Sequence, residues 1–353
     1  RRAIRFPNTR RIPPKKHPPC RFSPYAYYFC PVARARYCSR LNLPRPLTRY
    51  ASSPVVHRPP ASSRRRALAR CPRGVKGWID WRGPSQNGTS PEKGLPEKVD
   101  AKSALWAVPF PGQSTPVIHN GRLFINGYLG EGPDLQEIIS CFDAVSGKLI
   151  WENRLNDFLS DTIYLRYATS APAIDAETGN VYVQNTNGVL SCYTNDGKLV
   201  WRHSMMEQFG RLTFPNSRTA TPRIDQDLLI TRGVTSNWGA NGAAGDRFYA
   251  FDKRTGEIVW TSSPGERPQD NTFSHPVLTW LDGQRVLISA GGDSTIVCIN
   301  ARTGDPVFRY AAAKAGAKGG INASPIIHKG SLLVIHESEN LDSSEVGRAA
   351  SYK

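Results

Sequence analysis

The chain has 353 residues and a formal net charge of +17, a size that accommodates one large domain or two ordinary ones. Residues 1–79 hold 20 Lys or Arg and no Asp or Glu, whereas residues 80–353 hold 26 basic and 29 acidic side chains. The basic character therefore belongs to the N-terminal quarter, and no nucleic-acid partner is expected for the remainder. No run of 18 apolar residues occurs, which excludes a transmembrane helix.

Residues 1–75 are rich in Arg and Pro and lack the hydrophobic periods of helices and strands, so we predict that they are disordered. Three interpretations of this segment remain open: a basic arm for nucleic acid or anionic lipid, an Arg-rich transit peptide, or upstream DNA translated beyond the true start. We favour the third, because the chain begins with Arg rather than Met. No export signal is visible, since "LARC" at 68–71 has no apolar stretch before it.

From residue 104 onward the sequence repeats itself with a period of roughly fifty residues. The string "CFDAVSGKLIW" at 141–151 returns as "CYTNDGKLVW" at 192–201, as "AFDKRTGEIVW" at 250–260 and more faintly as "CINARTGDPVF" at 298–308. A Pro after small polar residues keeps the same period, at Pro116, Pro172, Pro222, Pro276 and Pro325. Two markers with one period indicate a repeat architecture.

Each unit is predicted to contain four short β-strands. The first starts near the Pro, the second follows a tight polar turn, the third resembles "IISCFDA" and the fourth resembles "KLIWEN". Alternating apolar residues, β-branched and aromatic side chains and bounding Gly turns support strands. Four-stranded units at this spacing are typical of a β-propeller. We therefore predict an all-β fold with four complete blades in residues 104–353 and part of a fifth blade.

A Gly in the turn between the third and fourth strands and a Trp on the fourth strand are predicted to join neighbouring blades. The Gly is expected to adopt positive φ, and the indole, which buries roughly 150–250 Å², is expected to cover the gap to the next blade. These structural positions are Trp106, Trp151, Trp201, Trp260, Gly147, Gly197, Gly256 and Gly304. The segment "ALWAVPF" around Trp106 is assigned to the outermost strand of the closing blade.

The repeat resembles the pyrroloquinoline-quinone (PQQ)-type propeller repeat. The tryptophan-docking motif of that family, Ala-x-Asp-x-x-Thr-Gly-x-x-x-Trp, is matched by Ala250, Asp252, Thr255, Gly256 and Trp260. The other copies depart from it by Cys for Ala, by Ser for Thr, by one missing residue, or by Phe for Trp. The resemblance covers residues 104–353, and "DWRGPSQNGTSPEKGLP" within the lead-in segment 76–103 is similar to the start of bacterial members.

This resemblance implies a periplasmic or cell-envelope protein with a ring of seven or eight blades, so the chain is expected to be truncated at its C-terminus. It also implies two function classes, quinoprotein dehydrogenases and non-enzymatic scaffolds similar to the assembly lipoprotein BamB. The dehydrogenases use a disulfide between adjacent cysteines, a calcium ion held by acidic and amide side chains, and an Asp base. No adjacent cysteines occur here.

Three cysteines, Cys141, Cys192 and Cys298, occupy equivalent third-strand positions in different blades. Such positions cannot reach the ~5.5 Å Cα separation of a disulfide, so we interpret these residues as small buried apolar side chains. No catalytic residue, metal ligand or resident cofactor is predicted. The alternative is a PQQ-dependent and calcium-dependent oxidoreductase whose catalytic residues lie in missing blades.

Topology predicts one face of the propeller as the binding face. In a four-stranded antiparallel blade, the segment leading into the first strand and the loop joining strands two and three lie at the same end. Every long connection of this chain falls at that end, where loops commonly carry function. We predict that a protein or glycan partner binds there, with no catalysis, through the candidate residues Tyr167, Arg211, Asn216, Arg218 and Trp238.

Overall fold

The computed structural model describes residues 77–156, 167–210, 220–235, 245–268, 272–312, 320–336 and 347–353. The chain divides into two units, Arg1–Arg64 and Arg65–Lys353, and every described residue belongs to the second. The segment 1–75, for which disorder is predicted, lies outside the described residues.

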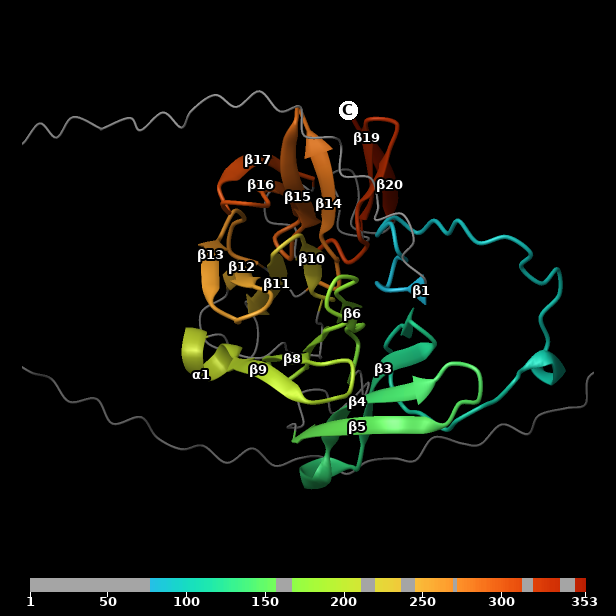
Figure 1. Cartoon of the computed structure of the whole chain (residues 1–353). Coiled ribbons are helices and arrows are strands. Elements are labelled where there is room, and N and C mark those ends of the chain that lie inside the picture. Colours follow the sequence, from blue (N-terminus) through green and yellow to red (C-terminus); the bar gives the residue numbers. More distant parts are fainter. Residues whose placement is uncertain are drawn as a thin grey trace, which may run out of the picture. The chain divides into compact units, whose positions relative to one another are not determined.

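Four sheets each contain one sequence repeat, with the strands in chain order and antiparallel throughout (Figure 1). Blade 1 consists of β2 (Val117–His119), β3 (Arg122–Leu129), β4 (Gln136–Asp143) and β5 (Leu149–Asn156). Blade 2 consists of β6 (Ala173–Ile174), β7 (Val181–Gln184), β8 (Val189–Tyr193) and β9 (Leu199–Ser204). Blade 3 consists of β10 (Arg223–Asp225), β11 (Leu228–Thr235), β12 (Gly245–Asp252) and β13 (Ile258–Ser262). Blade 4 consists of β14 (Val277–Leu281), β15 (Gln284–Ala290), β16 (Thr295–Asn300) and β17 (Pro306–Ala311).

A fifth sheet, blade 5, contains the three strands β18 (Ile326–His328), β19 (Ser331–His336) and β20 (Arg348–Tyr352). One further short strand, β1 (Gly77–Trp78), pairs with β2 at the edge of blade 1. The helical elements of the described residues are brief: η1 (Ala101–Ser103), η2 (Gly132–Asp134) and α1 (Met205–Phe209). The predicted all-β propeller with four blades and part of a fifth is confirmed.

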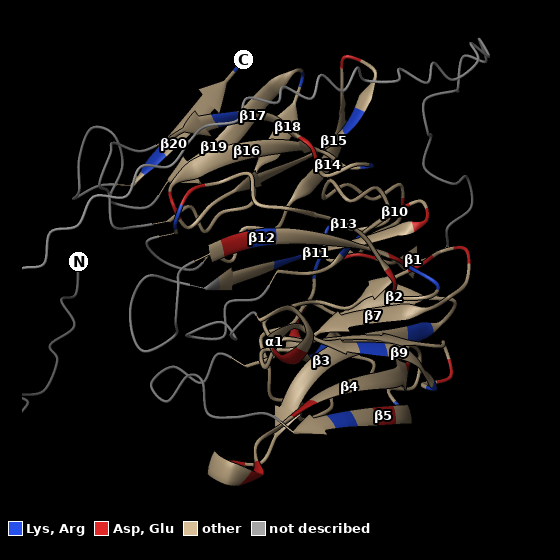
Figure 2. Ribbon diagram, turned by 90° about the vertical axis from the view of Figure 1, so that its left-hand side faces the viewer, with Lys and Arg blue, Asp and Glu red and all other residues tan. Residues whose placement is uncertain are grey.

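The apolar core lies between the blades. One cluster joins β2, β3 and β4 to β6, β7 and β8 through Phe124, Cys141, Val181 and other buried side chains. Corresponding clusters join blade 2 to blade 3, blade 3 to blade 4 and blade 4 to blade 5. Because alternate residues of a strand point to opposite faces, the two faces of one middle blade enter different clusters, and neither face is left to solvent. The blades therefore stack face to face, as Figures 1 and 2 show.

Indole rings join consecutive blades by lying on glycines. The glycines adopt φ between +70° and +80°, and a Cβ added to any of them would lie only 2.5 to 2.8 Å from an indole atom. The pairs are Trp106 on Gly147, Trp151 on Gly197, Trp201 on Gly256 and Trp260 on Gly304. Each Trp thus covers the turn of the blade that follows it in the sequence.

The same turns receive a hydrogen bond from the indole in three of the four joints. The Nε1 groups of Trp106, Trp151 and Trp201 donate to the backbone oxygens of Ala144, Asn195 and Lys253 at 3.2, 3.0 and 3.2 Å. The buried Nε1 of Trp260 has no partner within the described part of the chain. At the joint to blade 4 the indole therefore contributes ring packing without a hydrogen bond.

A β-bulge lies beside the docking aromatic residue of each complete blade, which is Trp151, Trp201, Trp260 or Phe308. In all four complete blades the pairing of the third and fourth strands shifts register at one place, between Cys141 and Phe142 in blade 1 and at the equivalent positions elsewhere. Cys141 opposes Trp151 and Phe142 opposes Leu149, so Ile150 is the extra residue. A bulge redirects the side chains that follow it, and here it turns the Trp toward the next blade.

The segment around Trp106 differs from its prediction. Residues 104–110 form no strand, because a strand needs a hydrogen-bonded neighbour and the described part of the chain provides none on this side. The segment nevertheless packs on blade 1, where Trp106 covers Gly147 and the ring of Phe110 meets that of Phe142 edge-on at 5.8 Å.

The joints yield a matched pair of substitutions. Gly256 and Gly283 both have φ +78°, but Trp201 lies on Gly256 and nothing lies within 4 Å of the position of a Cβ at Gly283. Both Gly→Ala changes should cost about 1–2 kcal/mol of backbone strain, and Gly256→Ala should cost about 2 kcal/mol more because the indole must move. Urea unfolding of the two variants measures the difference. Equal losses would show that the indole contributes no docking energy.

Candidate functional site

The long connections of the described blades lie at one end of the strands, which we call the long-loop face. The antiparallel pairing puts the β3–β4 loop and the segment leading into β6 at that end. The opposite end carries the tight turns, including the Gly turns of the joints. The position of η2 in the β3–β4 loop is visible below β4 and β5 in Figure 1.

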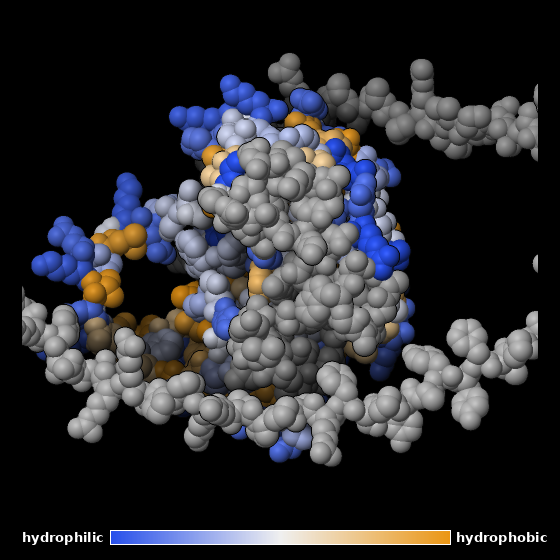
Figure 3. Space-filling model, turned by 180° about the vertical axis from the view of Figure 1, so that it is seen from behind, coloured by the Kyte–Doolittle hydropathy of each residue, from blue (hydrophilic) through white to orange (hydrophobic). Residues whose placement is uncertain are grey.

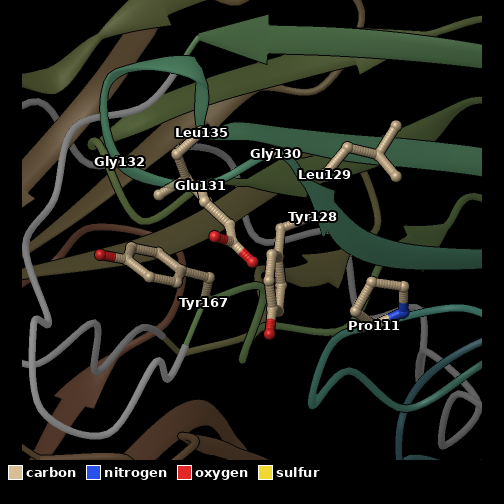
Figure 4. A pocket seen from close by; sticks show the side chains of 8 residues that line it. All are labelled: Pro111, Tyr128, Leu129, Gly130, Glu131, Gly132, Leu135 and Tyr167. Carbon is tan, nitrogen blue, oxygen red and sulfur yellow. The ribbon is translucent and has the colours of Figure 1, made fainter.

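A pocket of about 610 Å³ opens on the long-loop face of blade 1. Its lining combines aromatic and aliphatic side chains with one carboxylate and a glycine-rich loop (Figure 4). The lining residues are Pro111, Tyr128, Leu129, Gly130, Glu131, Gly132, Leu135 and Tyr167. The rings of Tyr128 and Tyr167 meet edge to face, with 5.7 Å between centroids and 61° between planes.

A buried carboxylate positions the wall of this pocket. Glu137, only 1% exposed, accepts hydrogen bonds from the backbone N–H of Ala168 at 2.6 Å and of Thr186 at 2.8 Å, and from the hydroxyl of Thr186. Ala168 adopts φ +53°, a conformation that costs free energy for a residue with a Cβ. The carboxylate thus helps to hold the strained backbone that places Tyr167 against Tyr128.

The glycine-rich loop is shaped by close backbone contacts. Gly130 has φ +77°, and a Cβ there would lie 2.2 Å from the backbone oxygen of Asp134. Tyr128 donates its backbone N–H to Pro111 at 3.0 Å, which attaches the segment before β2 to the pocket rim. These contacts keep Glu131 over the pocket. The loop contains one regular element, the short turn η2.

The structure describes one of the five predicted partner-binding residues. Tyr167 lies in the pocket wall but is fully buried, so its ring supports the pocket rather than standing on the surface. Arg211, Asn216, Arg218 and Trp238 lie outside the described residues. Sequence reasoning missed Tyr128, Glu131 and Glu137. The sequence contained one signal for Glu137. This acidic residue stands in the largely apolar third strand, and Asp246 occupies the equivalent position in blade 3.

The lead-in segment fills the inner edge of the described blades, where the first strands β2, β6 and β10 contact one another. Residues 77–86 contact blades 1 to 3 and the residues just before blades 4 and 5. β1 pairs with β2, and the backbone oxygen of Ile79 accepts from Ile174 at 3.0 Å. Arg82 Nη1 donates to the oxygen of Pro325, next to β18, at 3.1 Å.

A buried ion pair and an aromatic stack complete these contacts. Arg223 of β10 is fully buried, and its Nη1 lies 2.7 and 2.8 Å from the two carboxylate oxygens of Asp80. The ring of Trp81 lies 4.3 Å from that of His275, just before β14. The lead-in therefore acts as an internal tie between segments separated by more than a hundred residues.

Burial and the neighbouring cation Arg223 lower the pKa of His275 to about 3. The positive charges of Arg82 and Arg232 also lower this pKa. The pKa is therefore lowered even where the ring is only partly buried. His275 Nε2 also hydrogen-bonds with the hydroxyl of Thr221 at 3.0 Å. The imidazole is therefore neutral in the folded protein at neutral and mildly acidic pH.

The described residues do not fit a quinone–calcium centre of the kind that the resemblance implies. Cys141, Cys192 and Cys298 are buried in three different blades as free thiols, and burial raises the pKa of Cys141 and Cys298 to about 11 and that of Cys192 to about 12. Within the described ranges no three His, Cys, Asp or Glu side chains are grouped as metal ligands. The inner edge of the blades is packed with the chain's own lead-in.

The fold and the repeat define a β-propeller of PQQ-like blades. The family model described as outer membrane protein assembly factor BamB matches residues 97–231 and 134–350, and the chain belongs to this family. The two matches overlap, as expected when blades of one repeat can be aligned with one another. A search of curated proteins found no match. No helix of the described residues has the length and apolarity required to cross a membrane.

Solved structures of two kinds are similar to this chain. BamB from Moraxella catarrhalis is 16% identical over 59% of this chain and 56% of its own, with a TM-score of 0.38. The quinohemoprotein alcohol dehydrogenase from Comamonas testosteroni is 16% identical over 69% of this chain and 40% of its own, with a TM-score of 0.44. A europium-containing methanol dehydrogenase is 12% identical over 73% and 68%, with a TM-score of 0.47. These likenesses do not distinguish binding from catalysis.

The ion pair at the inner edge provides a stability test. Asp80→Asn leaves the Arg223 guanidinium buried without its counter-charge, and the free energy of unfolding should fall by about 3 kcal/mol. Asp196→Asn, which breaks the exposed Arg122–Asp196 pair at 2.8 Å, should cost less than about 1 kcal/mol. Chemical unfolding compares the two variants. Similar small losses would mean that the lead-in is not part of the cooperative unit.

The neutral imidazole predicts a loss of stability in acid. Because the folded pKa of His275 lies below the unfolded value of 6.5, the unfolded chain binds the proton first, and stability falls as the pH drops below 6.5 toward 3. Between pH 6.5 and 4.5 the loss from this residue should be on the order of 2 kcal/mol. His275→Gln should flatten that slope, whereas His328→Gln at the exposed end of β18 should leave it unchanged. Equal slopes in all three proteins would contradict the assignment.

Proposed function

We propose that this protein is a non-catalytic binding scaffold of the bacterial cell envelope that engages a partner protein through the long-loop face. The observation that carries the proposal is the division of the described blades into a filled inner edge and a preformed pocket at one end. Residues 77–86 occupy the inner edge, whereas the pocket of about 610 Å³ opens on the long-loop face.

The chemistry of the pocket supports binding. Aromatic and aliphatic side chains with a few polar groups are the usual lining of a recognition site, and that is the composition of this pocket. The cysteines of the described blades have raised thiol pKa values, so they are poor nucleophiles at neutral pH.

The family supports the proposed location. The matching family model is described as an outer membrane assembly factor, and we extend to this chain the envelope location and the binding of a protein partner. A quinone-dependent oxidoreductase is the competing function, and the experiment below includes the assay that would reveal it.

Site-specific photo-crosslinking tests which face binds. A photoreactive residue replaces Pro133, exposed in the β3–β4 loop, or Val145, exposed in the tight turn between β4 and β5 of the same blade. In the bacterium that produces the protein, position 133 should give a defined protein adduct by mass spectrometry, and position 145 should give none. Adducts at 145 but not at 133 would place the binding face at the wrong end.

A redox assay tests the competing function. The purified full chain is mixed with PQQ, calcium and an artificial electron acceptor over a panel of alcohols and sugars. We expect no dye reduction above background. Dye reduction that requires both PQQ and calcium would overturn the scaffold role.

A further inference from the structure

We propose that the long-loop pocket binds a cationic group, the guanidinium or ammonium of an Arg or Lys side chain on the partner protein. This inference rests on the proposed function and names the chemistry that its site would recognise. It requires three features together: an aromatic face, a carboxylate free to pair, and a frame that holds both in place.

The aromatic face comes from Tyr128. Its ring is partly exposed, and the buried ring of Tyr167 meets it edge to face at 5.7 Å. The face of an aromatic ring carries negative potential, which attracts a cation within about 6 Å of the centroid. Both Tyr128 and Tyr167 line the pocket, so a ligand in the pocket can reach the partly exposed Tyr128 ring.

The carboxylate comes from Glu131. In Figure 4 its oxygens point toward the gap between the two Tyr rings, and the residue is exposed at the pocket rim. Glu131 has no ion-pair partner among the described residues, whereas the carboxylates of Asp80, Asp175 and Asp246 are all paired. A ligand cation would therefore provide the counter-charge that the chain itself does not supply in this part.

Local charge favours a cation over a neutral or acidic ligand. The η2 turn adds the exposed carboxylate of Asp134 next to Glu131, and acidic residues colour this turn in Figure 2. No Lys or Arg is among the described lining residues. The Tyr128 ring and the Glu131 carboxylate line the same pocket. A cation that lies over the ring therefore also approaches the carboxylate.

The shape of the pocket argues against a glycan. A sugar ring is expected to need a flat aromatic platform with several neutral donors and acceptors, but the two Tyr rings stand at 61° to each other and Glu131 is the charged side chain in the lining. Seen from behind, apolar residues of the described surface form small groups separated by hydrophilic ones (Figure 3).

Hydrogen bonds and close backbone contacts hold the frame of the pocket in the absence of a ligand. Glu137 holds Ala168 and therefore Tyr167, Tyr128 is anchored to Pro111, and the close contact at Gly130 sets the loop that carries Glu131. A preorganised site loses little conformational entropy on binding. One cationic side chain thus serves as the anchor of a larger protein contact.

Ligand-detected NMR on the full chain tests the proposal with N-acetyl-arginine methylamide. The matched neutral probe is N-acetyl-citrulline methylamide, which has the same shape without the charge. We expect saturation of the arginine probe with a Kd on the order of millimolar, and binding at least about fivefold weaker for the citrulline probe.

Variants locate the binding to the pocket. Glu131→Gln and Tyr128→Leu should each weaken arginine binding about fivefold, whereas Asp134→Asn, with the same charge change on the same turn, should weaken it less than about twofold. Equal binding of the two probes, equal effects of Glu131→Gln and Asp134→Asn, or tighter binding of neutral saccharides would overturn the cation assignment. Circular dichroism confirms that each variant is folded.

The two proposals fail in different ways. If position 133 crosslinks a partner but the arginine probe does not bind, the scaffold role stands and the cation assignment is wrong. If the arginine probe binds in a Glu131-dependent way but position 133 gives no adduct, the pocket chemistry stands and the proposed scaffold role is wrong.

Discussion

The packing of an indole on a glycine turn is the contact on which the rest of this structure depends. Each turn must bring its backbone directly under a ring, which only a residue without a Cβ and with positive φ permits. The bulge on the fourth strand then aims the ring, and the position of every blade follows from the blade before it. Because the contact is repeated in sequence order, a displacement at one joint would also displace the blade at the next joint. This explains why the same short motif recurs four times and keeps its Gly in every copy.

The joints act near the tight-turn end, and the lead-in ties the blades at their inner edge. Ion pairs between neighbouring blades add to the joints, as Lys253 does with Asp175 at 2.9 Å and Arg285 does with Asp225 at 2.9 Å. At the inner edge, the Asp80–Arg223 pair is buried, and the partly buried rings of Trp81 and His275 lie in contact beside it. A charge buried there is tolerable only with its partner in place. The lead-in is therefore part of the folded unit.

The described part of the long-loop face contains the pocket of blade 1. Its pocket is held from behind by Glu137, which joins blade 1 to blade 2 through backbone hydrogen bonds. The strain at Ala168 is local to this site and is offset by those bonds.

The sequence by itself determined the repeat, the four strands of each blade, and the Gly and Trp positions of the joints. These features are local, because a period of two residues, a Gly turn and a Trp a few residues later are visible within one unit. Only the tertiary structure decided what residues 77–86 do, since Asp80 and Arg223 are 143 residues apart and no local pattern connects them. The pocket likewise needs Pro111, Tyr128 and Tyr167 from three separate segments. Its geometry arises from the stacking of blades, and this is why the sequence pointed to Tyr167 but missed Tyr128 and Glu131.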